Sequence, residues 1–188
     1  MKRTLTILTL GAVLLSTGCA GYEVPWLSLY PLYQGGDSAL DMELAGPWYS
    51  NDYESERLVF RKVANAYVMT DEILTDGQWK ETDRYDAFLL RLGDVLFIDL
   101  SASSQLAIRG HLFLKIRLDG NQLGIESLND EWLRQQVVEQ AALSYLDLPD
   151  STQPITAPTR ELRRFLLKYA NDPDAFATAS AWYHRRSP

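Results

Sequence analysis

The residues best suited to acid–base chemistry are acidic side chains that lie within a stretch of alternating polar and apolar residues. They are Asp71, Glu72, Asp83, Asp86, Asp94 and Asp99. Two carboxylates that converge at the mouth of a β-barrel can act as a proton donor and a proton acceptor. A solvated acidic rim is the alternative interpretation, and the sequence does not bring any two of the six together. We therefore assign no catalytic residue.

Few other groups could hold a metal ion or attack a substrate. The two histidines, His111 and His184, do not have the spacing of zinc ligands, and we interpret both as strand-surface residues. Residues 119–124 resemble the start of a calcium loop, but Leu123 occupies a position where an oxygen ligand belongs, so we interpret them as a turn. No nucleophile elbow or glycine-rich phosphate loop occurs in the sequence. We predict no metal site and no cofactor.

The single cysteine, Cys19, follows a segment typical of an export signal. A basic amino terminus precedes an uncharged apolar run over residues 4–15, which has the length of a signal-peptide core and is too short to span a bilayer. Small residues follow at once and lead into the cysteine. We predict that residues 1–18 are a signal peptide. With one cysteine, the chain forms no intramolecular disulfide.

The segment Ser16-Thr17-Gly18-Cys19-Ala20 resembles the lipobox of bacterial lipoproteins, in which a small residue precedes the cysteine that receives a diacylglycerol thioether. It departs from the usual family pattern at Ser16, where leucine is common. The resemblance implies lipidation at Cys19 and attachment to a membrane through acyl chains. Ala20 stands where aspartate commonly signals retention in the inner membrane, which implies the outer membrane, with the domain facing the periplasm. An ordinary secretory signal is the alternative.

The charge balance restricts the possible partners. The whole chain has a net charge of −7, and loss of Lys2 and Arg3 with the signal peptide would lower it by two further charges. An acidic protein lacks the basic surface that nucleic acid requires, and it is not attracted to anionic lipid. We expect attachment to the membrane through the lipid at Cys19, no nucleic acid, and either a small apolar ligand or another envelope protein as partner.

We interpret residues 19–42 as a lipid anchor and an aromatic-rich tether. The tether contains Tyr22, Trp26, Tyr30 and Tyr33, and its prolines forbid a regular helix. The rings could lie at the headgroup level of the membrane, or they could pack onto the folded domain.

Alternation with a period of two over about residues 44–128 predicts a meander of antiparallel strands. Residues 57–63 and 111–119 alternate, with Leu112, Leu114, Ile116 and Leu118 on one face of the second segment. Residues 95–100 are almost wholly apolar, as expected of a strand covered on both sides. Tight turns are predicted at residues 76–77, 93–94 and 119–121. The meander should form a curled sheet or small barrel.

Two helices are expected in the C-terminal half. Asn129 would cap the first, and Thr159 would be the N-cap of the second. The buried side of the first consists of Trp132, Leu133 and Val137. The apolar face of the second consists of Leu162, Phe165, Leu166 and Tyr169. Its solvated face consists of Arg160, Arg163, Arg164 and Lys168. Residues 175–185 should return as a last strand. The fold class is thus mainly β with two helices, in one domain over residues 43–188.

Two further resemblances concern this domain. Gly46-Pro47-Trp48 resembles the Gly-x-Trp signature of lipocalins, in which the tryptophan closes one end of the barrel. Residues 43–176 are similar to a group of uncharacterised bacterial lipoproteins. This likeness is carried by residues 45–48, 111–115, 131–133, 156–159 and 165–168. The likeness implies a lipocalin-like β domain in the cell envelope, and it implies no activity.

Five aromatic residues could line a ligand cavity or fill a small β core: Tyr49, Tyr53, Trp79, Tyr85 and Phe88. The function we expect is that of a membrane-anchored, non-catalytic binding or interaction module of the bacterial cell envelope. A hydrolase that uses paired carboxylates in the barrel mouth and a purely structural envelope component remain alternatives.

Overall fold

A computed structural model describes residues 26–35, 37, 43–102, 110–148, 153–176 and 180–186. The expected signal peptide over residues 1–18 and the expected lipidation site Cys19 lie outside these residues.

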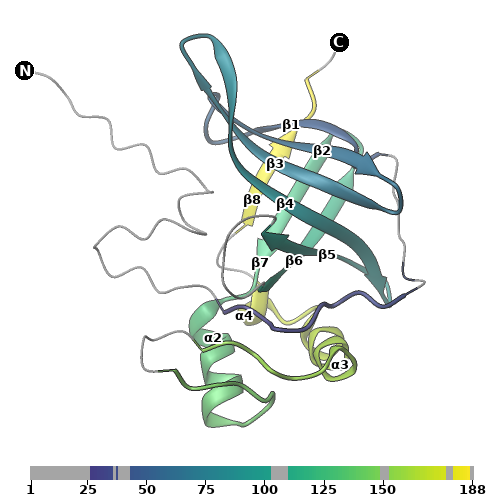
Figure 1. The fold of residues 1–188 in the computed structure, drawn as a ribbon, viewed down its shortest axis with the longest axis vertical. Coiled ribbons are helices and arrows are strands. Elements are labelled where there is room, and N and C mark those ends of the chain that lie inside the picture. Colours follow the sequence, from purple (N-terminus) through teal and green to yellow (C-terminus); the bar gives the residue numbers. More distant parts are fainter. Residues whose placement is uncertain are drawn as a thin grey trace, which may run out of the picture.

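Eight antiparallel strands form a closed barrel in which each strand pairs with the next along the chain and the last pairs with the first (Figure 1). They are β1 (Gly46–Ser50), β2 (Glu56–Val63), β3 (Ala66–Thr75), β4 (Gln78–Leu92), β5 (Val95–Ala102), β6 (His111–Asp119), β7 (Gln122–Ser127) and β8 (Ser180–His184). The three predicted turns join β3 to β4, β4 to β5 and β6 to β7, and each contains a glycine with positive φ. The prediction of an antiparallel meander is confirmed, and it closes into a barrel.

The alternation of the strands produces two apolar layers. Leu58, Phe60 and Ile116 point into the barrel and belong to its interior cluster. Phe97 and Phe113 point outward and are buried under the helices. In β5, Phe97 faces the helices and the next residue, Ile98, faces the barrel interior. Both faces of β5 are therefore covered, as its apolar sequence predicts.

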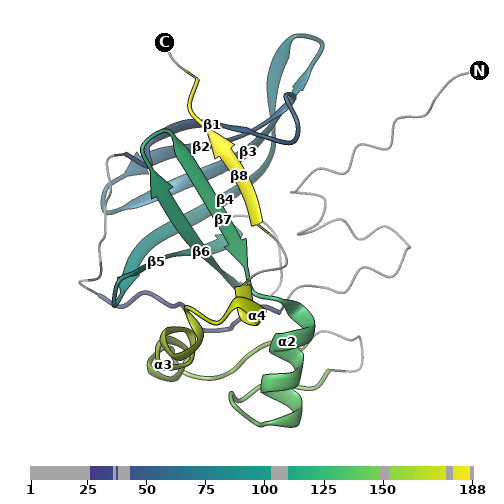
Figure 2. The same cartoon turned by 180° about the vertical axis from the view of Figure 1, so that it is seen from behind.

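The helices are inserted between β7 and β8 and lie together on one side of the barrel (Figures 1 and 2). They are α2 (Asp130–Arg134), the π-helical turn η1 (Gln135–Glu139), α3 (Thr159–Tyr169) and α4 (Pro173–Phe176). Their apolar faces pack on the outer faces of β4, β5 and β6. The barrel interior and this helical layer are therefore separate cores that share the strands between them.

Two details of the helical region differ from the sequence expectation. Asn129 caps α2 as predicted, since its side-chain oxygen accepts hydrogen bonds from two backbone N–H groups of the first turn. Thr159 is not an N-cap: Pro158 holds that position, and the Thr159 hydroxyl donates to the carbonyl of Pro31 at 2.7 Å. The last strand starts at Ser180 and not at residue 175, because Pro173 opens the short helix α4.

Residues 26–35 form a strap that runs between the barrel and the helices (Figure 1). Ser28 bridges to His111 of β6 and to Ile155. Leu32 is fully buried, and the Tyr33 ring stacks on Phe88 with centroids 3.9 Å apart. The rings of Trp26 and Tyr33 thus pack onto the domain, whereas Tyr30 is 47 % exposed.

The Gly46-Pro47-Trp48 segment lies at one end of the barrel, at the start of β1. Trp48 is fully buried, and its indole N–H donates to the Leu44 carbonyl at 2.8 Å. The guanidinium of Arg185, just after β8, lies 4.3 Å from the centroid of the Trp48 ring. Gly46 has φ +113°, and a Cβ there would lie 3.3 Å from Arg185. We refer to the opposite end, where β1, β3, β5 and β7 finish and the other four strands begin, as the mouth of the barrel.

Candidate functional site

The inner wall of the mouth carries three carboxylates on three different segments of strand. Glu56 begins β2, two residues before the inward-facing Leu58. Asp71 of β3 is the cross-strand neighbour of Leu58, and Asp83 of β4 is the cross-strand neighbour of Asp71. All three side chains are half-buried. The closed sheet therefore places two carboxylates side by side and a third one diagonal to them.

A β-bulge in the β3–β4 hairpin sets this arrangement. The register shifts between Asp71 and Glu72, so that Asp71 opposes Asp83 whereas Glu72 opposes Glu81. Thr82 is the extra residue, and its hydroxyl donates to the backbone carbonyl of Asp71 at 3.2 Å. The bulge keeps Asp71 and Asp83 on the inner face while the hairpin extends beyond the barrel.

The pKa values of all three carboxyl groups are raised. Burial raises the pKa of Asp71 to about 7, and the negative charges of Asp83 and Glu56 add to this effect. Burial also raises the pKa values of Asp83 and Glu56. A carboxyl group with a pKa near 7 exists in both protonation states at neutral pH, so Asp71 can donate or accept a proton there.

Tyr85 supplies a buried hydroxyl to the same site. It follows Asp83 by two residues on the inner face of β4 and is 4 % exposed. Its hydroxyl oxygen is inaccessible to solvent and has no hydrogen-bond partner among the described residues. Burial raises the pKa of Tyr85, and the charges of Asp83 and Asp71 raise it further, which places the phenol close to both carboxylates. Tyr183 of β8 is also buried in the barrel interior. Burial is the main cause of its raised pKa, and the charge of Asp71 is the next.

No hydrogen bond or ion pair joins the side chain of Glu56, Asp71 or Asp83 to any residue that the structure describes. Within the same residues, no three histidine, cysteine or acidic side chains are close enough together to hold a metal ion. Among the described residues, the mouth thus presents three carboxylates without a paired cation and a buried hydroxyl without a partner.

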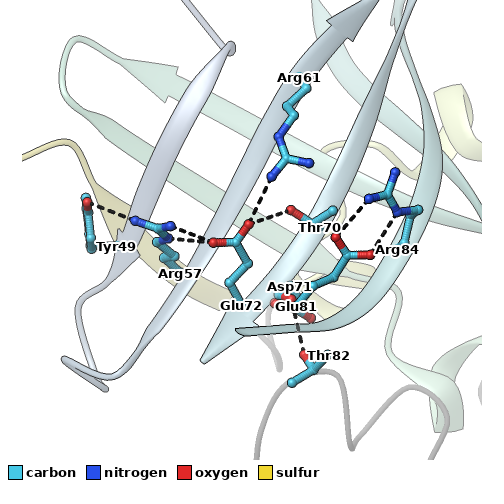
Figure 3. A network of polar contacts seen from close by, with 9 residues as sticks. All are labelled: Tyr49, Arg57, Arg61, Thr70, Asp71, Glu72, Glu81, Thr82 and Arg84. Atoms are coloured by element: carbon cyan, nitrogen blue, oxygen red, sulfur yellow. Dashed lines mark hydrogen bonds and ion pairs between the residues drawn. The ribbon is translucent and has the colours of Figure 1, made fainter. Parts of the chain in front are cut away.

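The outer face of the same strands is different (Figure 3). Glu72 is 6 % exposed, and one of its carboxylate oxygens accepts hydrogen bonds from Nε and Nη2 of Arg57 at 2.9 and 2.6 Å. Its other oxygen accepts from Arg61 and from the Thr70 hydroxyl, both at 3.2 Å. The Arg57 guanidinium also lies 4.2 Å from the Trp79 ring centroid. Both oxygens of Glu72 are therefore satisfied by the protein itself.

Two other buried carboxylates on the outer surface of the barrel are satisfied in the same way. Asp99, 1 % exposed, accepts a hydrogen bond from the Leu32 backbone N–H at 2.5 Å and contacts His111 Nδ1 at 2.7 Å. Glu126 pairs with Lys115 at 3.0 Å and with Arg117 at 2.7 Å. These groups hold the strap and the sheet in place.

The Asp99–His111 pair resembles part of a hydrolase triad, so its surroundings matter. The hydroxyl of Ser28, the serine that bridges to His111, donates to the Tyr30 carbonyl at 2.8 Å within its own turn. The edge of the Tyr33 ring faces His111. His111 was expected on an open strand surface, but the strap covers it. The pair fastens the strap. His184 does lie at the strand surface, where its Nδ1 contacts the Asn51 side chain at 2.8 Å.

Of the six acids considered from the sequence, the structure brings together Asp71 and Asp83. Glu72, Asp86 and Asp99 face outward, and Asp94 lies in the exposed β4–β5 turn. Of the five aromatic residues, only Tyr85 belongs to the barrel interior. Sequence reasoning missed Glu56, although its alternation with Leu58 and Phe60 places it on the inner face.

Comparison of the chain with protein-family models, with curated proteins and with solved structures gives no significant match. The resemblances to lipoproteins and lipocalins therefore stay predictions. Among the described residues, no helix is long and apolar enough to cross a membrane.

Proposed function

We propose that the protein is a lipid-anchored binding module of the bacterial cell envelope, held at the inner leaflet of the outer membrane by acyl chains on Cys19 and exposing its barrel mouth to the periplasm. The observation that carries the binding role is the set of unsatisfied polar groups in the mouth. A buried polar group costs free energy when it lacks a partner, and the Tyr85 hydroxyl is such a group among the described residues. The three half-buried carboxylates near it have no hydrogen bond or ion pair to the described residues either. A ligand that supplies these partners would be bound selectively.

The geometry favours a ligand at the mouth over an apolar ligand deep in the barrel. Large side chains fill the interior, among them Trp48, Phe60, Tyr67 and Leu123, all at most 1 % exposed. The end where Arg185 covers Trp48 supports a lipocalin-like barrel, since the Gly46-Pro47-Trp48 segment takes the role that the lipocalin resemblance implies. A lipocalin calyx holds its ligand inside the barrel. In this barrel the interior is filled, and we expect the ligand to bind at the rim, where the carboxylates are only half-buried.

A hydrolase is a second candidate, because Asp71 and Asp83 are direct cross-strand neighbours and the pKa of Asp71 is raised to about 7. Cross-strand neighbours have Cβ atoms about 5 Å apart, a separation compatible with paired catalytic carboxylates. In that case Asp71 would be the general acid and Asp83 the base or nucleophile.

One set of preparations tests anchor and binding. Cys19 is the only cysteine, so Cys19→Ser should take up no labelled fatty acid and should move from the membrane fraction to the buffer. A Cys19→Ser protein that still sediments with membranes would contradict the anchor. Native mass spectrometry of the wild-type protein should show a bound small molecule that the Asp71→Asn, Asp83→Asn double variant lacks. Recovery of that molecule intact supports binding, and its steady conversion to products by the wild-type protein supports the hydrolase.

A further inference from the structure

We propose that the mouth binds an organic cation, namely a primary ammonium or guanidinium group on a short apolar stem, held between Asp71, Asp83 and the hydroxyl of Tyr85. This proposal rests on the proposed function as a binding module, and it names the class of ligand.

The charge of the mouth is the first reason. Glu56, Asp71 and Asp83 lie on the inner face of three successive strands, and no cationic side chain among the described residues pairs with them. Elsewhere on this barrel every buried carboxylate discussed above has a basic group or N–H donors. A ligand that carries positive charge and several N–H donors relieves the repulsion and forms charge-assisted hydrogen bonds.

The hydroxyl of Tyr85 is the second and independent reason. It is buried on the inner face of β4, two residues after Asp83, where the charges of Asp83 and Asp71 act on it, and it has no partner among the described residues. A phenol can both donate and accept, and a ligand N–H or a water carried with the ligand completes its hydrogen bonding. A site with no ligand would leave this hydroxyl unsatisfied in the folded protein.

The walls of the site favour an organic cation over a bare metal ion. Metal ions need several oxygen ligands within about 2.0–2.6 Å, and no three such side chains of the described residues are close enough to provide them. Hydrogen bonds from N–H donors span about 2.7–3.2 Å and tolerate a wider separation. Leu58 and Met69, the cross-strand neighbours of Asp71 and Tyr85, make the layer beneath the carboxylates apolar. The rings of Tyr85 and Tyr183 attract cations.

Binding should strengthen as the pH rises through neutrality, because the ionised form of Asp71 is the form that attracts a cation. The titratable groups that act on this carboxyl or respond to its charge are Asp83, Glu56, Tyr85 and Tyr183. The two carboxyls oppose its ionisation, and the phenols stay protonated in the accessible range. The bound cation should in turn lower the pKa of Asp71, since binding and deprotonation are linked.

The experiment titrates the full-length protein, in a non-ionic detergent, with n-butylammonium chloride by isothermal calorimetry. We expect saturable binding that is about tenfold tighter at about pH 8.5 than at about pH 5.5. The Asp71→Asn, Asp83→Asn double variant should lose it. Tyr85→Phe, which removes only the orphan hydroxyl, should weaken it. Asp94→Asn, which removes the same charge from the exposed β4–β5 turn, should leave it unchanged. Near-ultraviolet circular dichroism checks that each variant folds.

Three results would overturn the proposal. One is the absence of saturable binding to n-butylammonium at the higher pH. The second is an equal response to NaCl at matched ionic strength, which would reveal general screening. The third is saturable binding of Ca²⁺ without binding of the amine, which would make the mouth a metal site. If wild-type protein that carries the lipid fails to bind the cation, the ligand class is wrong and the anchor stands. If wild-type protein isolated from cells binds the cation but carries no lipid, the anchor is wrong and the site stands.

Discussion

Asp71 and Glu72 are adjacent in the sequence and carry the same charge, but the sheet sends them to opposite sides. Glu72 faces outward and is 6 % exposed, with Arg57, Arg61 and Thr70 around its oxygens. Asp71 faces the mouth, where burial raises its pKa and the charges of Asp83 and Glu56 raise it further. The protein itself supplies hydrogen-bond partners to the Glu72 carboxylate, whereas the Asp71 carboxylate has none among the described residues.

The comparison separates structural carboxylates from a candidate binding site. A buried, fully paired charge helps to hold the fold in one arrangement. Removing one member of the pair is destabilising, because the other charge stays buried without a partner. A half-buried carboxylate with like-charged neighbours destabilises the fold at neutral pH, and such local conflicts are expected at functional sites. The following predictions test each side of this contrast.

Arg57→Ala should give the largest effect, because it removes two hydrogen bonds to Glu72 and the stacking on Trp79. It leaves a buried charge with weaker partners, and we expect a loss of about 3 kcal/mol in the free energy of unfolding, measured by urea denaturation. The second-site variant Glu72→Gln should restore part of this loss, because it neutralises the stranded charge. Strictly additive effects of the two substitutions would show that the pair is not coupled.

Asp71→Asn should have the opposite sign and a smaller size. The folded state holds the Asp71 proton up to about pH 7, whereas the unfolded chain releases it near its ordinary pKa of 3.8. Between these values the folded state binds more protons, so the free energy of unfolding falls as the pH rises and is constant outside the window. Asparagine cannot ionise, so the variant should gain about 2 kcal/mol over the wild type above the window and nothing below it.

The measurement is a series of urea midpoints across this pH range for the wild type and for Asp71→Asn. Parallel profiles for the two proteins would mean that Asp71 does not titrate in the window, and the contrast with Glu72 would then lose its electrostatic basis. Glu56 and Asp83 remain in the variant, and burial raises both of their pKa values, so a weaker slope of the same sign should persist.

The sequence predicts the strands well because their signal is local. Alternation in residues 57–63 and 111–119, the apolar run in β5 and the glycine turns each depend on a few neighbouring residues. Closure of the barrel is not local: β8 pairs with β1 only after a helical insertion of about fifty residues, and the strap reaches β5 and β6 from the other end of the chain. The mistaken N-cap at Thr159 has the same origin, since its hydroxyl serves Pro31.

The site shows the same limit. Asp71 and Asp83 are among the six acids that the sequence suggests, but only the register of β3 against β4 separates them from Glu72 and Asp86. That register depends on the bulge at Thr82, and no local sequence pattern predicts this bulge. Glu56 could have been found by extending the alternation of β2 by one step. The orphan state of the Tyr85 hydroxyl depends on the whole barrel interior and is not a property of any segment.

Arg84→Ala should show the smallest effect and marks the lower limit of the comparison. Arg84 pairs with Glu81 at 2.8 Å on the outer face of β4, but both side chains are exposed, at 47 % and 37 %. Hydrogen bonding to Arg84 holds the pKa of Glu81 below its ordinary value, so the substitution should raise that pKa. Solvent and salt screen an exposed pair, and the urea midpoint should stay within experimental error. The pKa of Glu81, followed by nuclear magnetic resonance, reports the lost contact. A large drop in the midpoint would mean that exposed pairs on this face also stabilise the fold, and exposure would no longer distinguish Arg84 from Arg57.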